Sequence, residues 1–187
     1  MPEDQRPDRA ARSVRLRPAT EGDISLLIAI ETDAGELFRT VGLDAIADEE
    51  PDDPDTLRAH VHDGTAWVAE SGGEVVGYAI ASIVGGHAHL DQVSVIRAAQ
   101  GSGIGRALIE QVERWGRDQG LGAVSLTTFT DVPWNGPYYA RLGYEEVPTG
   151  EITSGLAAIR ASEKANGLDL LPRIAMHKAL TFDDSAT

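Results

Sequence analysis

HLDQVSVIRAAQGSGIGRALIEQVERW, residues 89–115, is the stretch that predicts the architecture of this chain. It begins with an apolar run rich in β-branched residues, which predicts a strand ending near Ile96. A glycine loop follows from Gly101 to Gly105. Beyond it, apolar residues recur at helical spacing and form one face: Ile104, Ala107, Leu108, Val112 and Trp115. The stretch therefore predicts a strand, a glycine loop and a helix in succession.

A glycine loop at the start of a helix is suited to binding an anion. The first N–H groups of a helix have no partner inside it, and the helix dipole adds partial positive charge there. Glycines lack the Cβ atoms that would hold a ligand at a distance. We therefore expect a phosphate group to bind at this loop.

Two common phosphate motifs do not fit the loop. The dinucleotide fingerprint G-x-G-x-x-G requires a small last residue, but Arg106 or Leu108 stands there, depending on which glycine begins the count. The P-loop requires a Gly-Lys pair, and the chain contains none. These failures disfavour a nucleotide-binding protein of the Rossmann type.

The composition is that of a globular protein with one domain. The 187 residues are enough to bury a core, and 42% of them are hydrophobic. No run approaches the ~18 apolar residues of a membrane span, and residues 1–13 lack the apolar centre of a signal peptide. The absence of cysteine excludes disulfides and thiol catalysis. We expect a cytoplasmic protein with no membrane partner.

The net charge of −14 limits the possible partners. A chain this acidic repels a phosphate backbone, so we expect no nucleic-acid partner. The same field attracts a cationic substrate. Acidity that only keeps the protein soluble is nevertheless the simpler interpretation.

Periodicity and turn residues predict strands that alternate with helices. Thr20 and Asp23 have the form of a capping box, and a charged loop at 44–55 is interpreted as a solvated linker. We predict one domain over residues 14–180, a disordered lead-in over 1–13 and a loose tail over 181–187. The expected strands are 14–17, 66–70, 75–84, a strand ending near 96, 123–128, 144–147 and 173–180, and the expected helices lie near 24–38, 54–62, 104–119, 137–142 and 153–166.

Two motifs in this order resemble one enzyme family. The first is Q-x-x-G-x-G, from Gln100 through Gly103 to Gly105, and the second is N-x-x-x-Y-x-x-x-G-[FY], from Asn135 through Tyr139 to Tyr144. Together they resemble the GNAT superfamily of N-acetyltransferases, which bind acetyl-coenzyme A. The resemblance implies an α/β fold in which helices flank a central mixed β-sheet of six to seven strands. It also implies that the strands before and after the coenzyme-binding helix splay apart.

The resemblance assigns the coenzyme to the splayed gap and the glycine loop. The pantetheine arm would pair with the strand at Val93, Ser94 and Val95, and the diphosphate would lie on the loop backbone. No metal is implied. The coenzyme-binding residues would be Val93, Ser94, Val95, Gln100, Gly101, Ser102, Gly103, Ile104, Gly105, Arg106, Asn135 and Tyr139.

Acetyl transfer to an amine requires two proton transfers, because the amine must lose a proton and the departing thiolate benefits from gaining one. Tyr139 matches the family's tyrosine acid, and Tyr138 is the neighbour that a shift of one residue would select. His89 and Asp91 lie two residues apart on one strand and share a face. The sequence does not decide whether the base is His89, Asp91 or a water relay. Alternatively, both residues only form a polar strand edge near the Gly85-Gly86 turn and have no catalytic role.

The resemblance predicts an acetyl-coenzyme A-dependent N-acetyltransferase that acts on a small-molecule or peptide amine. A non-catalytic coenzyme-binding regulatory module on the same fold is the alternative. A homodimer is predicted from family habit. The acceptor walls are expected in residues 20–62 and 145–172, where no motif identifies the amine, and Glu163 in the second of these is interpreted as part of a solvated acidic face.

Overall fold

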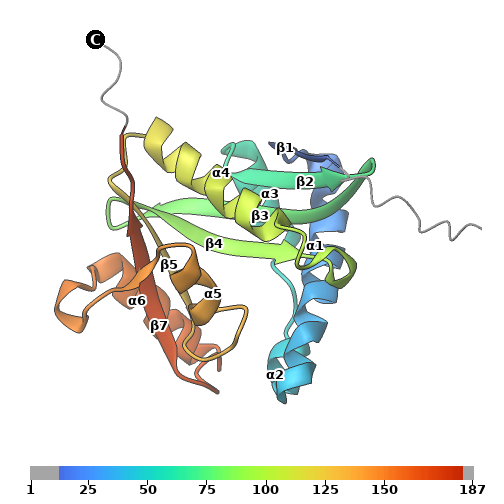
Figure 1. The fold of residues 1–187 in the computed structure, drawn as a ribbon. Coiled ribbons are helices and arrows are strands. Elements are labelled where there is room, and N and C mark those ends of the chain that lie inside the picture. The colour runs from blue at the N-terminus through green and yellow to red at the C-terminus, as the bar shows by residue number, and fades with distance from the viewer. Residues whose placement is uncertain (1–12, 183–187) are drawn as a thin grey trace, which may run out of the picture.

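The computed structural model describes residues 13–182, which form a twisted sheet between two layers of helices (Figure 1). The predicted lead-in and tail lie outside these residues, except for Ser13, Thr181 and Phe182. The described residues contain one seven-stranded sheet with the strand order β1-β2-β3-β4-β5-β7-β6. Its strands are β1 (Val14–Pro18), β2 (Ala66–Ser71), β3 (Glu74–Val84), β4 (His87–Val95), β5 (Ala123–Phe129), β6 (Glu145–Glu146) and β7 (Arg173–Ala179).

The predicted mixed α/β sheet is confirmed. Strands β1 to β4 are antiparallel neighbours, β4 and β5 are parallel, and β7 is antiparallel to both β5 and β6. A helix separates β4 from β5, as a parallel pair requires. The helices are α1 (Ile24–Gly35), α2 (Asp44–Ala47), α3 (Pro54–His62), α4 (Ile104–Asp118), α5 (Gly136–Arg141) and α6 (Ser154–Ala165), with 3-10 turns η1 (Glu21–Asp23), η2 (Glu36–Val41), η3 (Arg97–Ala99) and η4 (Thr149–Glu151).

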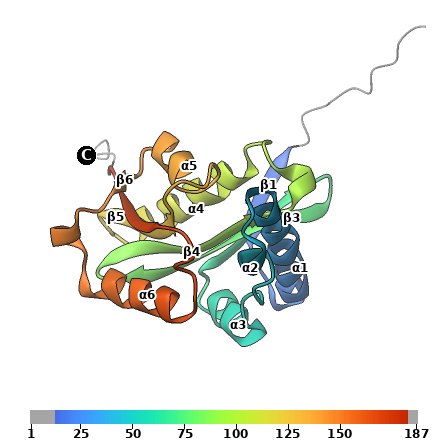
Figure 2. The same cartoon turned by 90° about the horizontal axis from the view of Figure 1, so that it is seen from below.

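Each face of the sheet has its own apolar core. The view in Figure 2 places α4 and α5 on one face and α1, α3 and α6 on the other. On the α4 face, Leu108 and Val112 are fully buried in the cluster that contains Val124. On the opposite face, Leu27 of α1 and Leu57 of α3 are fully buried. The helical periodicity predicted for α4 therefore matches the face that the helix buries.

The predicted splay lies between β4 and β5. Only two residue pairs join these strands, Ala88 with Val124 and His89 with Ser125. From Leu90 onward β4 pairs only with β3 among the described residues, whereas β5 continues to pair with β7. The two strands diverge in Figure 1 and leave a gap in the middle of the sheet.

A β-bulge in β4, which the sequence did not reveal, lies at the start of this gap. Leu90 pairs with Ala81 and Gln92 pairs with Ile80, so Asp91 is an extra residue on its strand. A bulge bends its strand and redirects side chains, and bulges are common next to active sites.

Two predicted elements are wrong in detail. Residues 44–55 are not simply a solvated linker, because α2 forms there and buries Ile46 against Phe129 and Val132. Strand β6 has two residues rather than four. By contrast, the predicted capping interaction is confirmed in that the Asp23 carboxylate accepts hydrogen bonds at 2.8 Å from both the backbone N–H and the hydroxyl of Thr20.

None of the helices between residues 13 and 182 combines the length and the apolar content that crossing a membrane requires.

Candidate active site

The splay opens into a large cleft of about 1280 Å³. One side is lined by β4 from Val93 onward, the glycine loop and the start of α5. The other side is lined by α1, η2, the segment from Glu49 to Asp52, Asp91 of β4, and the end of β5 with the loop to Trp134. We refer to these two sides as the coenzyme wall and the acceptor wall, after the roles that the resemblance implies for them.

The glycine loop presents bare backbone to the cleft. Gly101 and Gly103 have φ values of +72° and +86°, a left-handed conformation that favours glycine. A Cβ atom added to either residue would meet no atom of residues 13–182 within 4 Å, so the described part of the chain leaves the space beside them open. Helix α4 begins directly after Gly103 and directs its first N–H groups towards this end of the cleft. These features have the geometry that the predicted anion site requires.

Side chains around the loop shape it rather than fill it. The Gln100 amide donates a hydrogen bond of 3.2 Å to the Val95 carbonyl, which ties the loop to the end of β4. The Ser102 hydroxyl donates to the Ala99 carbonyl within the loop. Arg106 is exposed and pairs with Glu110 at 2.7 Å, so its charge is partly compensated. Of these predicted coenzyme contacts, Arg106 alone has a charge to offer to a phosphate.

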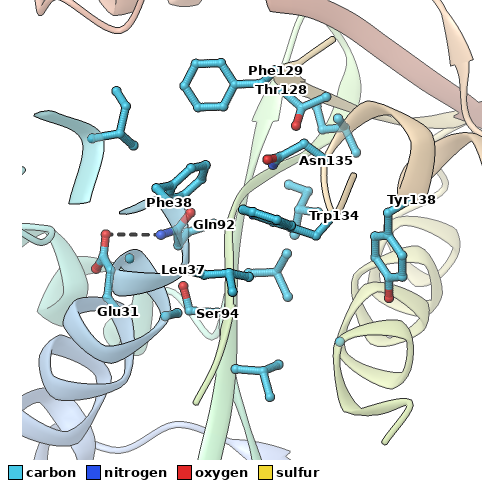
Figure 3. A pocket seen from close by; sticks show the side chains of 18 of the residues that line it. Glu31, Leu37, Phe38, Gln92, Ser94, Thr128, Phe129, Trp134, Asn135 and Tyr138 are labelled. Carbon is cyan, nitrogen blue, oxygen red and sulfur yellow. Dashed lines mark hydrogen bonds between the residues drawn. The ribbon is translucent and has the colours of Figure 1, made fainter. Parts of the chain in front are cut away.

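Strand β4 presents a free edge to the same cleft. Val93 and Val95 pair with Ala79 and Gly77 of β3, and the opposite edge of β4 has no strand partner there among residues 13–182. Ser94 is 6% exposed and its side chain lies in the cleft (Figure 3). An unpaired strand edge offers N–H and C=O groups to an extended ligand that contains amides.

Asp91 lies at the bulge and lines the cleft. The Ser82 hydroxyl donates a hydrogen bond of 3.0 Å to its carboxylate. Asp91 keeps exposed surface, but partial desolvation of its carboxylate, supported by the charge of Asp52, raises its pKa to about 6, although Ser82 and His60 oppose the rise. A carboxylate with a pKa near 6 is a suitable proton acceptor at neutral pH.

His89 is not among the residues that line the cleft. It is 3% exposed, and its Nδ1 lies 2.9 Å from the Ser125 hydroxyl, which itself donates to the Ala88 carbonyl at 3.2 Å. Burial lowers the pKa of His89 to about 4, so the imidazole is neutral at pH 7. The structure does not bring His89 and Asp91 together at the cleft, and it favours Asp91 as the base.

The two neighbouring tyrosines both line the cleft and differ in burial. Tyr139 is 8% exposed, packs edge-on against Tyr144 with ring centroids 5.8 Å apart, and has its pKa raised by burial. Tyr138 is half-buried, and its hydroxyl would lie 3.4 Å from a Cβ atom at Gly105. Tyr138 therefore faces the glycine loop, whereas Tyr139 lies deeper, against the core.

Asn135 starts α5 and also lines the cleft. Its backbone carbonyl accepts the N–H groups of Tyr138 and Tyr139 at 2.8 and 3.0 Å. Its side chain makes no capping hydrogen bond, and its Oδ1 is buried without a partner among the described residues. A buried acceptor without a donor is costly, and the Oδ1 of Asn135 is free to accept a hydrogen bond if a donor is bound in the cleft.

The acceptor wall contains functional groups that sequence reasoning missed. Glu31 of α1 lines the cleft, and its carboxylate accepts hydrogen bonds from the Tyr78 hydroxyl at 2.7 Å and the Gln92 amide at 3.1 Å (Figure 3). The backbone N–H of Asp52 donates to the same carboxylate at 3.2 Å. Helical spacing placed Glu31 on α1 but gave no signal that partners on three other segments would hold it at the cleft.

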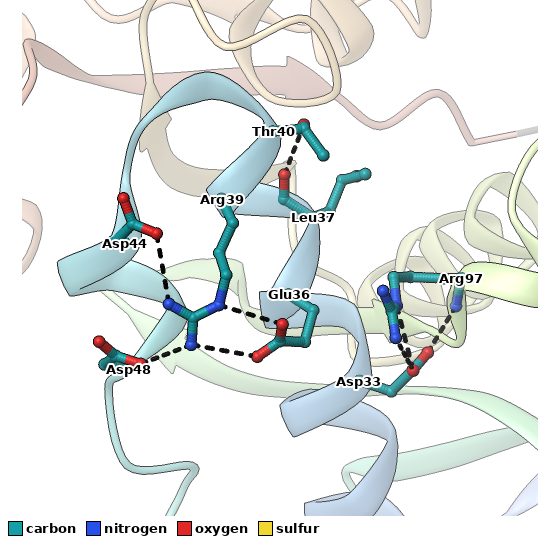
Figure 4. Close-up of polar contacts among 8 residues, drawn as sticks. All are labelled: Asp33, Glu36, Leu37, Arg39, Thr40, Asp44, Asp48 and Arg97. Atoms are coloured by element: carbon teal, nitrogen blue, oxygen red, sulfur yellow. Dashed lines mark hydrogen bonds and ion pairs between the residues drawn. The ribbon is translucent and has the colours of Figure 1, made fainter.

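Ion pairs position the segments of the acceptor wall. Arg39 of η2 pairs with Asp44 and Asp48 of the α2 region and with Glu36, as Figure 4 shows. Asp33 of α1 accepts the Arg97 backbone N–H at 2.7 Å and also pairs with its guanidinium (Figure 4). These contacts hold η2 beside α2 and α1 beside the end of β4.

Glu163 is not part of a solvated face, contrary to the sequence interpretation. Its side chain is 12% exposed and pairs with Arg160 and, at 2.8 Å, with Arg173. It also accepts a hydrogen bond from Thr127 of β5. This network attaches α6 and β7 to the strand that borders the cleft.

Comparison with known proteins gives a consistent result. Residues 29–144 match the acetyltransferase (GNAT) family. N-acetyltransferase family 8 member 2 of Rattus norvegicus is 42% identical over 78 residues, which cover 38% of this chain and 33% of the relative. The chain therefore spans about a third of the length of this curated relative.

Solved structures match over nearly the whole chain. Ribosomal-protein-alanine N-acetyltransferase from Brucella melitensis is 26% identical, with a TM-score of 0.64 and coverage of 89% of this chain and 99% of that one. N-acetylglutamate synthase from Neisseria gonorrhoeae, complexed with coenzyme A and N-acetyl-glutamate, is 18% identical, with a TM-score of 0.65 and coverage of 91% and 36%. At that identity the second likeness shows the fold alone.

Proposed function

This chain belongs to the acetyltransferase (GNAT) family, and we propose that it transfers the acetyl group of acetyl-coenzyme A to a primary amine by direct attack. One observation carries the proposal: a single cleft contains the bare glycine loop, the free edge of β4, Asp91 and Tyr139. An anion site, an amide-binding edge, a proton acceptor and a phenol are the groups that this reaction requires.

The residues of the coenzyme wall fit acetyl-coenzyme A, which would supply the acetyl thioester. Gly101 and Gly103 leave room for a diphosphate next to the N-terminus of α4. The edge of β4 offers backbone groups to pantetheine amides, and the Oδ1 of Asn135, which has no partner within residues 13–182, is an acceptor for an amide N–H. Tyr138, beside Gly105, is suited to contact the coenzyme rather than to act in chemistry.

In this proposal Asp91 takes the proton of the incoming amine and Tyr139 gives a proton to the departing thiolate. The raised pKa of Asp91, about 6, makes it a stronger base than an ordinary carboxylate while leaving it ionised at pH 7. The raised pKa of Tyr139 keeps its phenol protonated at neutral pH. The two residues therefore start in the protonation states that the reaction needs.

The direct test is turnover by the purified full chain. Thiol release from acetyl-coenzyme A in the presence of a panel of primary amines should exceed the rate without an amine. Coenzyme A binding, measured by calorimetry, provides the separate readout. Binding without amine-dependent thiol release would reject the enzyme and select the alternative, a non-catalytic acyl-coenzyme A-binding regulatory module.

Two further predictions from the sequence stay predictions. A cytoplasmic location follows from composition and awaits localisation of the full chain in cells. A homodimer awaits sedimentation at micromolar concentration, where a species of only 19.9 kDa would reject it.

A further inference from the structure

We propose that the acceptor is a primary amine that bears an apolar, preferably aromatic, group and has no carboxylate close to the amine. The inference rests on the proposed acetyl transfer and names the substrate class of the same cleft. It comes from the acceptor wall, where an aromatic surface and a set of carboxylates line one cavity.

The aromatic part of the acceptor wall consists of Phe38, Phe129 and Trp134, all of which line the cleft. The Phe38 ring meets the other two edge-on, with ring centroids 5.7 Å from Phe129 and 5.8 Å from Trp134. Phe129 is buried, whereas Phe38 and Trp134 are half-buried and keep exposed ring surface. In the view of Figure 3, Phe38 and Trp134 lie between Glu31 and Tyr138. An apolar group bound here would cover ring surface that is otherwise in water.

Apolar packing holds the aromatic part in place, so its surface is preformed. Phe38 and Trp134 pack against the buried cluster of Leu43, Ile46, Phe129 and Val132, whereas the Arg39 ion pairs that join η2 to α2 are exposed and contribute little (Figure 4). The Arg173 guanidinium lies over the Phe129 ring, 4.5 Å from the ring centroid. Preformed apolar surface with a few polar groups is typical of small-ligand sites.

The charged part includes three carboxylates, those of Glu31, Asp52 and Asp91, beside Glu49 and Glu50, which line the same cleft. Within residues 13–182, none of the three carboxylates forms an ion pair with a Lys or Arg side chain. Partial desolvation raises the pKa of each, and the charge of Asp52 adds to the rise for Glu31 and Asp91, whereas the nearby His60 opposes the rise for Asp52 and Asp91. A cationic amine would relieve this repulsion, and a carboxylate would increase it.

Glu31 is arranged to receive one more donor. A carboxylate has about four lone-pair sites, and Tyr78, Gln92 and the Asp52 N–H occupy three of them. The three donors are neutral, so they orient the carboxylate without cancelling its charge. An ammonium or amine N–H fits the remaining site on Oε1.

The arginines on or beside the acceptor wall are already paired, whereas Arg141, which forms no ion pair among residues 13–182, lines the cleft at α5, on the coenzyme wall. Arg173 lines the cleft, but its guanidinium contacts Glu163 at 2.8 Å and covers Phe129. Arg39 and Arg97 are likewise bound to carboxylates. An acceptor with a free carboxylate would therefore be repelled by the three carboxylates, and none of Arg39, Arg97 and Arg173 is free to pair with it. This wall is unsuited to an amino-acid acceptor of the kind implied by the N-acetyl-glutamate bound to the Neisseria gonorrhoeae enzyme.

Four amines that differ in one group each test the inference on the full chain. 2-Phenylethylamine has the ring and no carboxylate, phenylalanine adds the carboxylate, phenylalaninamide neutralises it, and ethylamine lacks the ring. We expect kcat/KM for 2-phenylethylamine or phenylalaninamide to exceed that for phenylalanine and for ethylamine by about tenfold or more. A preference for 2-phenylethylamine indicates a free amine in the cell, and a preference for phenylalaninamide indicates a peptide amino terminus. A higher kcat/KM for phenylalanine, or an equal one for ethylamine, would overturn the inference.

Binding separates this inference from the proposed function. The same four amines are added to the protein saturated with coenzyme A, and the shift in Tm is recorded. A larger shift with 2-phenylethylamine than with phenylalanine supports the inference even if no acetyl transfer occurs. Equal shifts would contradict it, whatever the turnover.

Two variants probe the two parts of the wall. Phe38→Ala should raise KM for 2-phenylethylamine about tenfold, because the ring of this amine would lose its contact with Phe38. KM for ethylamine, which has no ring, should stay unchanged. Asp52→Asn should reduce the ratio of kcat/KM for phenylalaninamide to kcat/KM for phenylalanine on the order of fivefold, because it removes one negative charge near the carboxylate of bound phenylalanine. Glu74→Gln, at the exposed β2–β3 turn, makes the same change in net charge outside the cleft and is the matched control. If Glu74→Gln narrows the preference as much as Asp52→Asn does, the general field of the acidic protein is responsible and the inference fails.

Discussion

The coenzyme wall and the acceptor wall of one cleft are built in different ways. The coenzyme wall is mostly backbone from a contiguous stretch, the end of β4 and the loop up to Arg106, with α5 as its one distant part. The acceptor wall consists of side chains from α1, η2, the loop before α3 and the end of β5. Backbone recognition leaves glycines in the sequence, whereas a wall of side chains from separate segments leaves no local pattern.

The two walls also differ in polarity. The coenzyme wall has the N-terminus of α4, which favours an anion. The acceptor wall has Glu31, Asp52 and Asp91, which favour a cation. This polarity matches an anionic acetyl donor on one side and a protonated amine on the other. The following predictions test the contrast between the walls, starting with the largest expected effect.

Asp91→Asn should cause the largest loss on the acceptor wall. We expect kcat/KM to fall by about 10²–10⁴, the usual range for a general base. In the wild type, kcat/KM should rise with pH through about 6 as Asp91 loses its proton, and that rise should be missing from the variant. Ser82→Ala removes the hydrogen bond that lowers this pKa, so it should move the rise to higher pH.

The stability of Asp91→Asn provides the control for folding. The pKa of Asp91 is raised in the folded state, so its ionisation destabilises the fold as pH rises from about 4 to about 6. The variant should therefore have an equal or higher Tm at pH 7.5. A variant that is fully active, or one that is inactive only because its Tm collapses, would remove Asp91 from the mechanism.

Tyr139→Phe tests the junction of the two walls. The ring and its contact with Tyr144 remain, and only the hydroxyl is lost. We expect kcat to fall by about 10²–10³, with coenzyme affinity nearly unchanged, because proton donation matters only as the thiolate departs. Burial raises the pKa of Tyr139, so wild-type kcat should not decline at pH values below about 10. Tyr138→Phe is the control and should change the KM of the coenzyme more than kcat.

Gly103→Val tests whether the coenzyme wall acts through bare backbone. The residue has φ +86° and open space beside it, so valine adds both backbone strain and a side chain where a diphosphate would lie. We expect coenzyme A affinity to fall on the order of 100-fold, equivalent to about 3 kcal/mol. Gly120→Val introduces similar strain at φ +70° beyond the other end of α4. It should lower Tm similarly while keeping the affinity, and equal affinity losses in both variants would remove the loop from the site.

His89→Gln should have the smallest effect on activity, less than about threefold in kcat, since His89 does not line the cleft. Its effect should appear in stability instead. The pKa of His89 is lowered to about 4 in the folded state, so its contribution is complete above pH 6.5 and is lost as pH falls towards 4. The drop in Tm between pH 7.5 and pH 5 should therefore be smaller in the variant. A large loss of kcat with the acid rise abolished would restore His89 as the base.

The strands of the first half of the sheet were predictable because their signals are local. Gly72-Gly73 and Gly85-Gly86 have positive φ values at the two turns that join β2 to β3 and β3 to β4, and apolar runs between them mark the strands. The short β6 and α2 were not predictable from pattern. Strand β6 pairs with β7 at only two residues. Helix α2 forms because Ile46 packs against Phe129, which lies far along the chain.

Asp91 and His89 show the same limit at the site. The sequence places them two residues apart on one face of a strand, and this position alone does not show which of them is the base. Only the register of β4 against β3 makes Asp91 a bulge at the cleft. Only the short pairing with β5 encloses His89 beside Ser125.

By itself the sequence determined the order of elements and the family of the chain and predicted the anion site at Gly103, because each depends on neighbouring residues and on backbone geometry that glycine permits. The tertiary structure alone decided which carboxylates line the cleft and which aromatic rings lie beside them. Glu31, Phe38 and Trp134 meet in one cleft because helix packing and the splay of two strands bring together segments about 100 residues apart. Those contacts depend on the packing of distant surfaces, and spacing along the chain does not encode them.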